Sequence, residues 1–167
     1  ACAAASAEGA VQAVNFNCPG QTVIAGAEKG VSTAVELLKE KGAKKAVILP
    51  VSAPFHSTLM APAAKKLAAE LDKVALHDAA FPVVSNYTGG LQQMAAEIKA
   101  NLVAQADHPV RWIACVSAMR DFGADIYIEC GPGKTLAGFN KRIDKTLTSL
   151  NVEDDASLQK TLDTLNK

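Results

Sequence analysis

The sequence predicts an α/β protein with two lobes. In the first fifty residues, segments follow in the order strand, strand, helix, strand, which is the order of the later part of a ferredoxin-like unit. Beyond them, helical and strand-like segments alternate, and residues 125–129 have the apolar centre typical of a strand in a parallel sheet. We therefore expect part of a ferredoxin-like small lobe over residues 1–50 and a larger α/β lobe over residues 51–167.

The expected small lobe begins with the end of a helix at residues 3–9. Alternating apolar residues then predict a strand over residues 11–17. The sequence C-P-G-Q at 18–21 is a turn signal, and it joins this strand to a second one over residues 22–26. These segments together predict a β-hairpin.

An amphipathic helix is expected after the hairpin. Its apolar residues keep the i, i+3, i+4, i+7 spacing of one helix face, and they are Val31, Ala34, Val35 and Leu38. Residues 45–51 are apolar at their centre and predict a third strand. Because a ferredoxin-like unit has one more strand and helix before these elements, we expect its beginning to lie upstream of this sequence.

The larger lobe is expected to be mostly helical around two strands. Pro62 is compatible with a helix over residues 58–72 only in the first turn, and Leu67 and Leu71 would form the apolar stripe of that helix. The remaining expected elements are a strand at 81–85, helices at 91–104 and 110–121, a strand at 125–129, a helix after Gly133 and a helix entered from Asp155.

The composition excludes several classes of protein. The 167 residues include 17 Lys+Arg and 17 Asp+Glu, so the net charge is zero, without the basic excess of a dedicated nucleic-acid binder. No apolar run approaches the roughly 18 residues of a membrane span. The cysteines have no metal-ligand spacing, so we expect free thiols in a reducing, cytoplasmic compartment and no metal site; they are Cys2, Cys18, Cys115 and Cys130.

The most informative stretch runs from Leu49 to Met60. A predicted strand ends there, a loop with two prolines follows, and His56 stands at the entrance to a helix. Catalytic side chains favour such loops, and histidine suits proton transfer near neutral pH. A structural or merely exposed histidine also fits this position when the stretch is considered alone.

Four blocks of sequence together are more specific than any one of them. They are P-V-S-A-P-F-H-S-T-L-M at 50–60, N-F-N-C-P-G-Q-T-V-I-A-G at 15–26, Q-A-D-H-P-V-R-W at 105–112 and E-C-G-P-G-K-T-L at 129–136. In order and spacing they resemble the malonyl-CoA:acyl carrier protein transacylases, over essentially the whole chain. The resemblance implies a hydrolase-like large lobe beside the small lobe, with residues 51–167 as the C-terminal part of the acyltransferase subdomain.

The resemblance implies acyl transfer in fatty acid biosynthesis. A serine would accept the malonyl group of malonyl-CoA, and the phosphopantetheine thiol of acyl carrier protein would then collect it, with no resident cofactor. His56 would be the general base and acid, and the backbone carbonyl of Gln105 would accept the imidazole N–H. Phe55 would crowd a 2-methyl branch of the substrate, and Asn17 and Gln21 would bind the acyl or pantetheine part.

The block that begins at Glu129 invites comparison with a phosphate-binding loop. A Walker A loop would need a glycine in place of Ile128, so the sequence predicts no ATP site. The helix after this loop is basic, and the partner that the resemblance implies, an acyl carrier protein, is acidic. We therefore expect carrier-protein docking at Lys134, Lys141 and Arg142, although each could equally be a solvated side chain.

The sequence also departs from the family. It contains no G-x-S-x-G, the pattern around the family's nucleophilic serine. The expectation is a C-terminal half without its N-terminal half, inactive alone because the serine is absent. Two alternatives stay open: a non-catalytic ligand- or partner-binding module, and an acyltransferase domain of the polyketide-synthase type.

Overall fold

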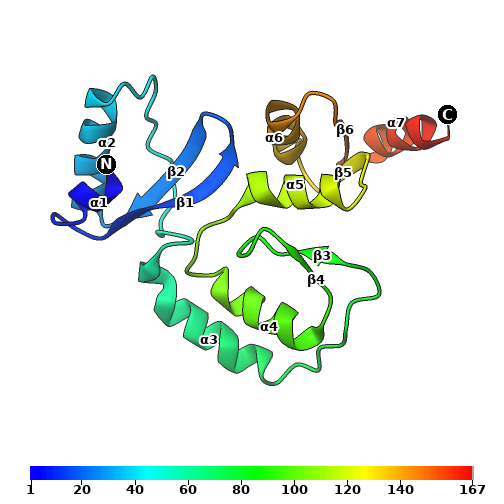
Figure 1. The fold of residues 1–167 in the computed structure, drawn as a ribbon, viewed down its shortest axis with the longest axis horizontal. Coiled ribbons are helices and arrows are strands. Elements are labelled where there is room, and N and C mark those ends of the chain that lie inside the picture. Colours follow the sequence, from blue (N-terminus) through cyan, green and yellow to red (C-terminus); the bar gives the residue numbers. More distant parts are fainter. Residues whose placement is uncertain (167) are drawn as a thin grey trace.

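A two-stranded hairpin and two helices form the N-terminal end of the molecule. The computed structural model describes residues 1–166. The elements are α1 (Cys2–Ala5), β1 (Val11–Cys18), β2 (Gln21–Gly26) and α2 (Glu28–Glu40), grouped at one end in Figure 1. Ala5, Val11 and Ala34 are buried together between them. The predicted hairpin and the amphipathic helix after it are confirmed.

The prediction of a third strand at 45–51 is wrong. This segment pairs with no strand of residues 1–166, and Val47, Ile48 and Val51 are 60%, 74% and 62% exposed. Apolar residues give a segment the capacity to pair, but a strand also needs a neighbour that shares its backbone hydrogen bonds. The order within residues 1–50 is therefore helix, strand, strand, helix, followed by an exposed connection.

Two antiparallel helices and a small β-ribbon form the middle of the molecule. They are η1 (Thr58–Met60), α3 (Ala61–Leu71), β3 (Val83–Val84), β4 (Leu91–Gln92) and α4 (Ala95–Ala104). Pro62 lies in the first turn of α3 as predicted, whereas Leu67 of the expected apolar stripe is 37% exposed and the buried residue is Ala64. The helix expected from residue 91 begins later, because residues 91–92 pair with β3.

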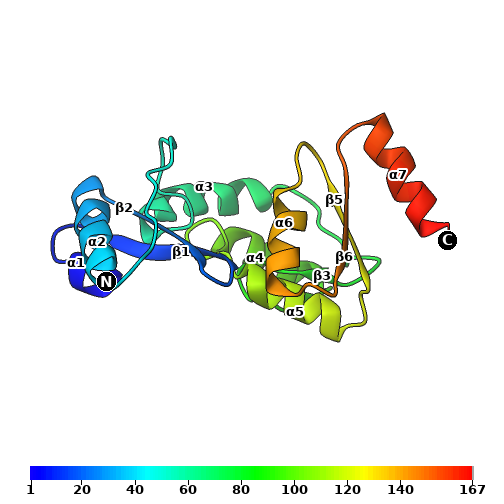
Figure 2. The same cartoon turned by 90° about the horizontal axis from the view of Figure 1, so that it is seen from above.

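A parallel pair of strands organises the C-terminal part. The elements are α5 (Trp112–Asp121), β5 (Ile126–Cys130), α6 (Thr135–Ile143), β6 (Thr148–Val152) and α7 (Asp155–Leu165). Val116, Tyr127 and Leu147 form a second buried cluster. Strand β6, which pairs with β5, was not predicted, because it lacks the apolar run that signals a buried strand. Three of its five residues are polar: Thr148, Ser149 and Asn151. Figure 2 shows α7 projecting at the end of the molecule opposite α1 and α2.

The hairpin is bonded to the rest of the chain through its first strand. The amide N–H of Phe16 donates to the carbonyl oxygen of Val110 at 2.9 Å, and the amide N–H of Val110 donates to that of Val14 at 2.8 Å. This parallel bridge lies directly before α5, so backbone hydrogen bonds hold the hairpin against the α4–α5 connection. Over residues 1–166, no helix is both long and apolar enough to cross a membrane.

Candidate functional site

The backbone of His56 is strained. Among residues 1–166 it is the one non-glycine residue with a positive φ, at 62°. This left-handed conformation costs a residue with a Cβ roughly 1–2 kcal/mol. The next residue anchors the turn, since Ser57 is 1% exposed and its hydroxyl donates to the carbonyl oxygen of Pro54 at 2.6 Å. The fold therefore holds the histidine in a conformation that local preference disfavours, which is typical of functional sites.

The ring of His56 meets the end of helix α4. Its Nδ1 lies 2.8 Å from the backbone carbonyl oxygen of Gln105, across 49 residues of sequence. A carbonyl oxygen can only accept, so Nδ1 must hold the proton in this contact. In the neutral ring Nε2 then has the lone pair, which is the form required of a general base.

The carbonyl of Gln105 is available because of Pro109. Gln105 follows α4 and its own N–H donates to the carbonyl oxygen of Asn101. If the helix continued, the residue four positions later would donate to Gln105, but Pro109 has no N–H. The last carbonyl is therefore left for a side chain from elsewhere in the fold. The spacing Q-x-x-x-P signals this arrangement in the sequence.

The hairpin also contacts the histidine loop, through a residue that sequence reasoning missed. Gln12 of β1 accepts hydrogen bonds at its Oε1 from both the amide N–H and the hydroxyl of Thr58, at 3.2 and 3.0 Å. Three separate segments thus converge: β1, the His56 loop and the α4–α5 connection. No sequence pattern pointed to Gln12, because an outward glutamine on a strand is an ordinary surface residue.

Comparison with known proteins finds relatives that match almost the whole chain. No family model matches the chain. The malonyl CoA-acyl carrier protein transacylase of Bacillus subtilis is 43% identical over 157 residues, which are 94% of this chain and 50% of that protein. The crystal structure of acyl-carrier-protein S-malonyltransferase from Burkholderia pseudomallei 1710b superimposes with a TM-score of 0.93 at 51% identity, covering 97% of this chain and 53% of that one.

Over nearly its whole length, this chain is homologous to the malonyl-CoA:acyl carrier protein transacylases. It spans about half the length of the relatives that it matches. A further similar structure, at 42% identity and a TM-score of 0.94, is described as a malonyl-transacylase in complex with its type II PKS acyl-carrier protein.

The residues expected to bind the transacylase substrate lie in two places. Phe55 precedes His56 and is 51% exposed. Asn17 lies on the hairpin, between the paired residues Phe16 and Cys18, where the register shifts as in a β-bulge. Gln21, at the hairpin turn, accepts at Oε1 from the Cys18 thiol at 3.5 Å.

Gln21 is also bonded to one of the residues expected to dock the carrier protein. Arg142 of α6 donates to Gln21 Oε1 at 2.9 Å and to the carbonyl oxygen of Pro19 at 3.3 Å. The guanidinium therefore links α6 to the turn of the hairpin, a contact that the sequence did not reveal. Lys134 and Lys141 are exposed, at the start and in the last turn of the same helix.

Carboxylates already occupy the loop before α6. The amide N–H of Gly133 donates to Glu153 Oε2 at 2.7 Å, and that of Ala137 donates to Glu129 Oε2 at 2.9 Å. An anion at this helix N-terminus would have to displace these two side chains.

Two side chains of residues 1–166 that could be mistaken for a nucleophile are structural. The Ser57 hydroxyl is buried and bonded to Pro54. Cys115 is 1% exposed, its thiol contacts the carbonyl oxygen of Ser85 at 3.5 Å, and burial raises its pKa to about 11. Such a thiol stays protonated at neutral pH and is a poor nucleophile. No cluster of three or more metal-ligating side chains is found within the same residues.

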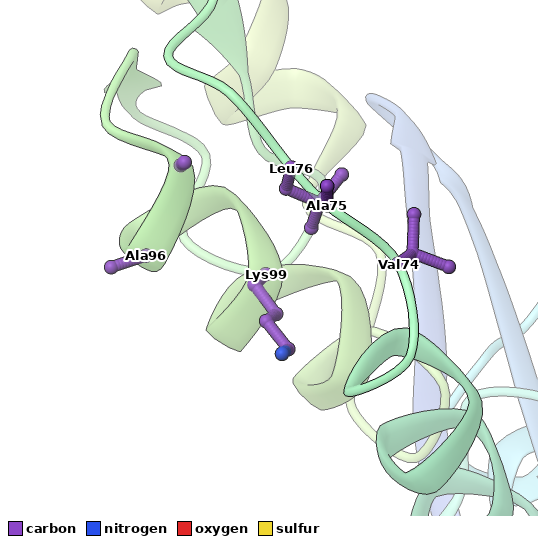
Figure 3. Close-up of a pocket in the computed structure, with 6 residues that line it drawn as sticks. Val74, Ala75, Leu76, Ala96 and Lys99 are labelled. Carbon is purple, nitrogen blue, oxygen red and sulfur yellow. The ribbon is translucent and has the colours of Figure 1, made fainter.

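Two cavities lie away from His56. One of about 340 Å³ separates the segment after α3 from α4, and Figure 3 shows Val74, Leu76 and Lys99 around it. The Lys99 ammonium pairs with Asp72 at 2.9 Å. The other, of about 230 Å³, is lined by residues of α5, β5, α6 and β6, among them Trp112, Glu129 and Asn140. His56 lines neither cavity.

Proposed function

We propose that this chain supplies the proton-transfer half of a malonyl transacylase, an enzyme that moves malonyl from malonyl-CoA to acyl carrier protein. The observation that supports it most is the contact of His56 Nδ1 with the Gln105 carbonyl at 2.8 Å. The second observation that supports the proposal is the similarity of almost the whole chain to proteins named for this activity. The contact leaves Nε2 as the base, and the similarity indicates the reaction.

The proposed reaction has two symmetrical steps. A serine hydroxyl attacks the thioester carbonyl of malonyl-CoA while His56 Nε2 takes its proton. The C–S bond then breaks, and His56 returns the proton to the leaving coenzyme A thiolate, which leaves a malonyl-serine ester. In the second step the pantetheine thiol attacks the ester carbonyl while His56 accepts the thiol proton; the C–O bond to serine then breaks, and His56 returns the proton to the serine oxygen.

In this proposal the Gln105 carbonyl replaces the carboxylate of a Ser-His-Asp triad. It fixes the ring orientation and the tautomer of His56, as the aspartate does. A neutral carbonyl stabilises the imidazolium less than a carboxylate would, because it lacks a full negative charge. The side chain of Gln105 has no part in this role.

The nucleophile and the remaining active-site groups are proposed to come from outside these 167 residues. The chain has no G-x-S-x-G, so it is expected to be inactive alone. The proposed enzyme has two lobes that divide this chain at residue 50, in a cytoplasmic setting without a cofactor. The exposed segment 45–51 and the edge of β5 that pairs with no strand of residues 1–166 are the places where further strands would pair.

Substrate and partner contacts complete the proposal. Phe55 would select malonyl over a 2-methyl branched analogue, a discrimination worth roughly 1–3 kcal/mol for one methyl-sized group. Asn17 and Gln21 would bind the acyl or pantetheine part. Lys134, Lys141 and Arg142 would meet the acidic carrier protein. A polyketide carrier is a second candidate partner, favoured by the similar malonyl-transacylase in complex with a type II PKS carrier.

The test is a chimera in which residues 1–167 replace the matching half of the Burkholderia pseudomallei transferase, which is 51% identical. We expect the chimera to transfer malonyl from malonyl-CoA to an acyl carrier protein, and His56→Ala to slow it about 10²- to 10⁴-fold, the usual contribution of a positioned acid–base group. His77→Ala removes an exposed histidine and is the matched control. A folded chimera whose rate does not depend on His56 would refute the proposal.

A further inference from the structure

The turn between α4 and α5 contains a second histidine contact, one residue from the first. His108 Nδ1 lies 2.9 Å from the carbonyl oxygen of Ala104, the last residue of α4. The neighbouring carbonyl, that of Gln105, is the one that meets His56. Two imidazole rings from different parts of the chain therefore donate to two consecutive carbonyl oxygens at the end of one helix.

Asp107 fixes the tautomer of His108. The same Nδ1 lies 2.6 Å from Asp107 Oδ1, so both of its neighbours are acceptors and the nitrogen must hold a proton. The Asp107 side chain is 19% exposed and that of His108 is 48% exposed, so the carboxylate is the more enclosed member of the pair. A carboxylate beside an imidazole N–H is the usual means of orienting a histidine ring.

The other face of this turn rests on the β3–β4 connection. The ring of Tyr87 meets that of His108 edge-on, with centroids 4.9 Å apart. The amide N–H of Arg111 donates to the carbonyl oxygen of Asn86 at 2.9 Å. The backbone of the turn itself is weakly bonded, since Asp107 N–H reaches the Ala104 carbonyl only at 3.3 Å. Side chains therefore supply much of what holds the turn in place.

We propose that Asp107 and His108 are positioning residues for the acid–base histidine, an inference that rests on the proposed function. By holding the Ala104 carbonyl, His108 limits rotation of the adjoining peptide, whose own carbonyl is that of Gln105. The Gln105 oxygen is thereby kept directed at His56 Nδ1. Pro109 leaves the Gln105 carbonyl without a backbone donor, and the Asp107–His108 pair orients that carbonyl toward His56.

The experiment is ¹⁵N NMR of the histidine rings in the 167-residue chain, which reports the tautomer of each imidazole. Wild type should show His56 protonated at Nδ1. His108→Ala should lower the Nδ1–H to Nε2–H ratio of His56 by roughly 2- to 10-fold, the factor that corresponds to one ordinary hydrogen bond. His108→Asn, whose amide can donate to the Ala104 carbonyl, should restore the ratio. His77→Ala, the control, should leave it unchanged.

An unchanged His56 ratio in folded His108→Ala, or no rescue by His108→Asn, overturns the proposal. If His108→Ala does not fold, Asp107→Ala gives the same information, because it removes the acceptor that orients the His108 ring. An unchanged His56 tautomer ratio in that variant would also overturn the proposal. The readout needs no substrate. Failure of this inference is therefore distinct from failure of acyl transfer in the chimera.

Discussion

His56 combines a strained backbone with a fixed ring. Its φ of 62° is a conformation that glycine adopts without cost, and its ring is bonded to a carbonyl 49 residues away. A chain selected for stability alone would place glycine here. The strain is consistent with a residue retained for what its side chain does.

The first stability prediction concerns this position. His56→Gly should be more stable than His56→Ala by about 1 kcal/mol, because alanine keeps the Cβ that the left-handed conformation disfavours and glycine does not. Urea unfolding of the 167-residue chain, followed by circular dichroism, measures the difference. At Phe55, where φ is not positive, the order of the Gly and Ala variants should reverse. Equal stability of the two His56 variants would contradict the strain.

The site was only partly predictable from the sequence. The pattern around His56, with the family resemblance, indicated both the histidine and the Gln105 carbonyl as its partner. Pro109 was readable in the sequence and explains why that carbonyl is open. The positive φ of His56 and the Gln12 contact were not predictable, because each depends on how distant segments pack.

At the scale of elements, Arg142 connects the hairpin turn to α6. It donates to Gln21 Oε1 and to the Pro19 carbonyl, across more than a hundred residues of sequence. An acidic partner that bound Arg142 would compete with both acceptors. The hydrogen bonds of Arg142 thus connect the hairpin turn to the proposed docking helix.

A double-mutant cycle tests this connection. Arg142→Ala and Gln21→Ala should show a coupling of roughly 1 kcal/mol in the free energy of unfolding, the worth of an exposed hydrogen bond to a charged group. Lys141→Ala combined with Gln21→Ala is the matched control and should show additivity. Additive effects of the Arg142 and Gln21 changes would mean that the contact contributes nothing to stability.

Element prediction succeeded where local signals were strong. The C-P-G-Q turn defined the hairpin, and α7 begins as expected near Asp155, with Asp154 capping it by accepting from the Ser157 amide at 2.8 Å. Residues 45–51 misled because they are apolar but have no partner among residues 1–166. The predicted helix start at residue 91 was wrong for the opposite reason: residues 91–92 pair with β3 and form β4 instead of the first turn of the helix.

The molecule as a whole has more surface than its mass requires. A monomer of 17.4 kDa normally has about 7,900 Å² of accessible surface, whereas the described residues have 10506 Å². Exposed apolar side chains contribute to the excess; examples are Ile48, Ile126 and Ile128. β5 and β6 form a two-stranded parallel sheet, and such sheets are usually buried within larger ones. These features fit a chain that functions with further segments of protein around it.

The central claim is that this chain supplies the proton transfer and another segment supplies the nucleophile. The most direct measurement is to incubate the chimera with malonyl-CoA, quench it in acid, digest it and locate the malonyl group by mass spectrometry. The account predicts a malonyl ester on a serine of the Burkholderia part, formed more slowly in His56→Ala. A malonyl group on a residue of this chain, such as Ser57 or Cys130, would contradict it.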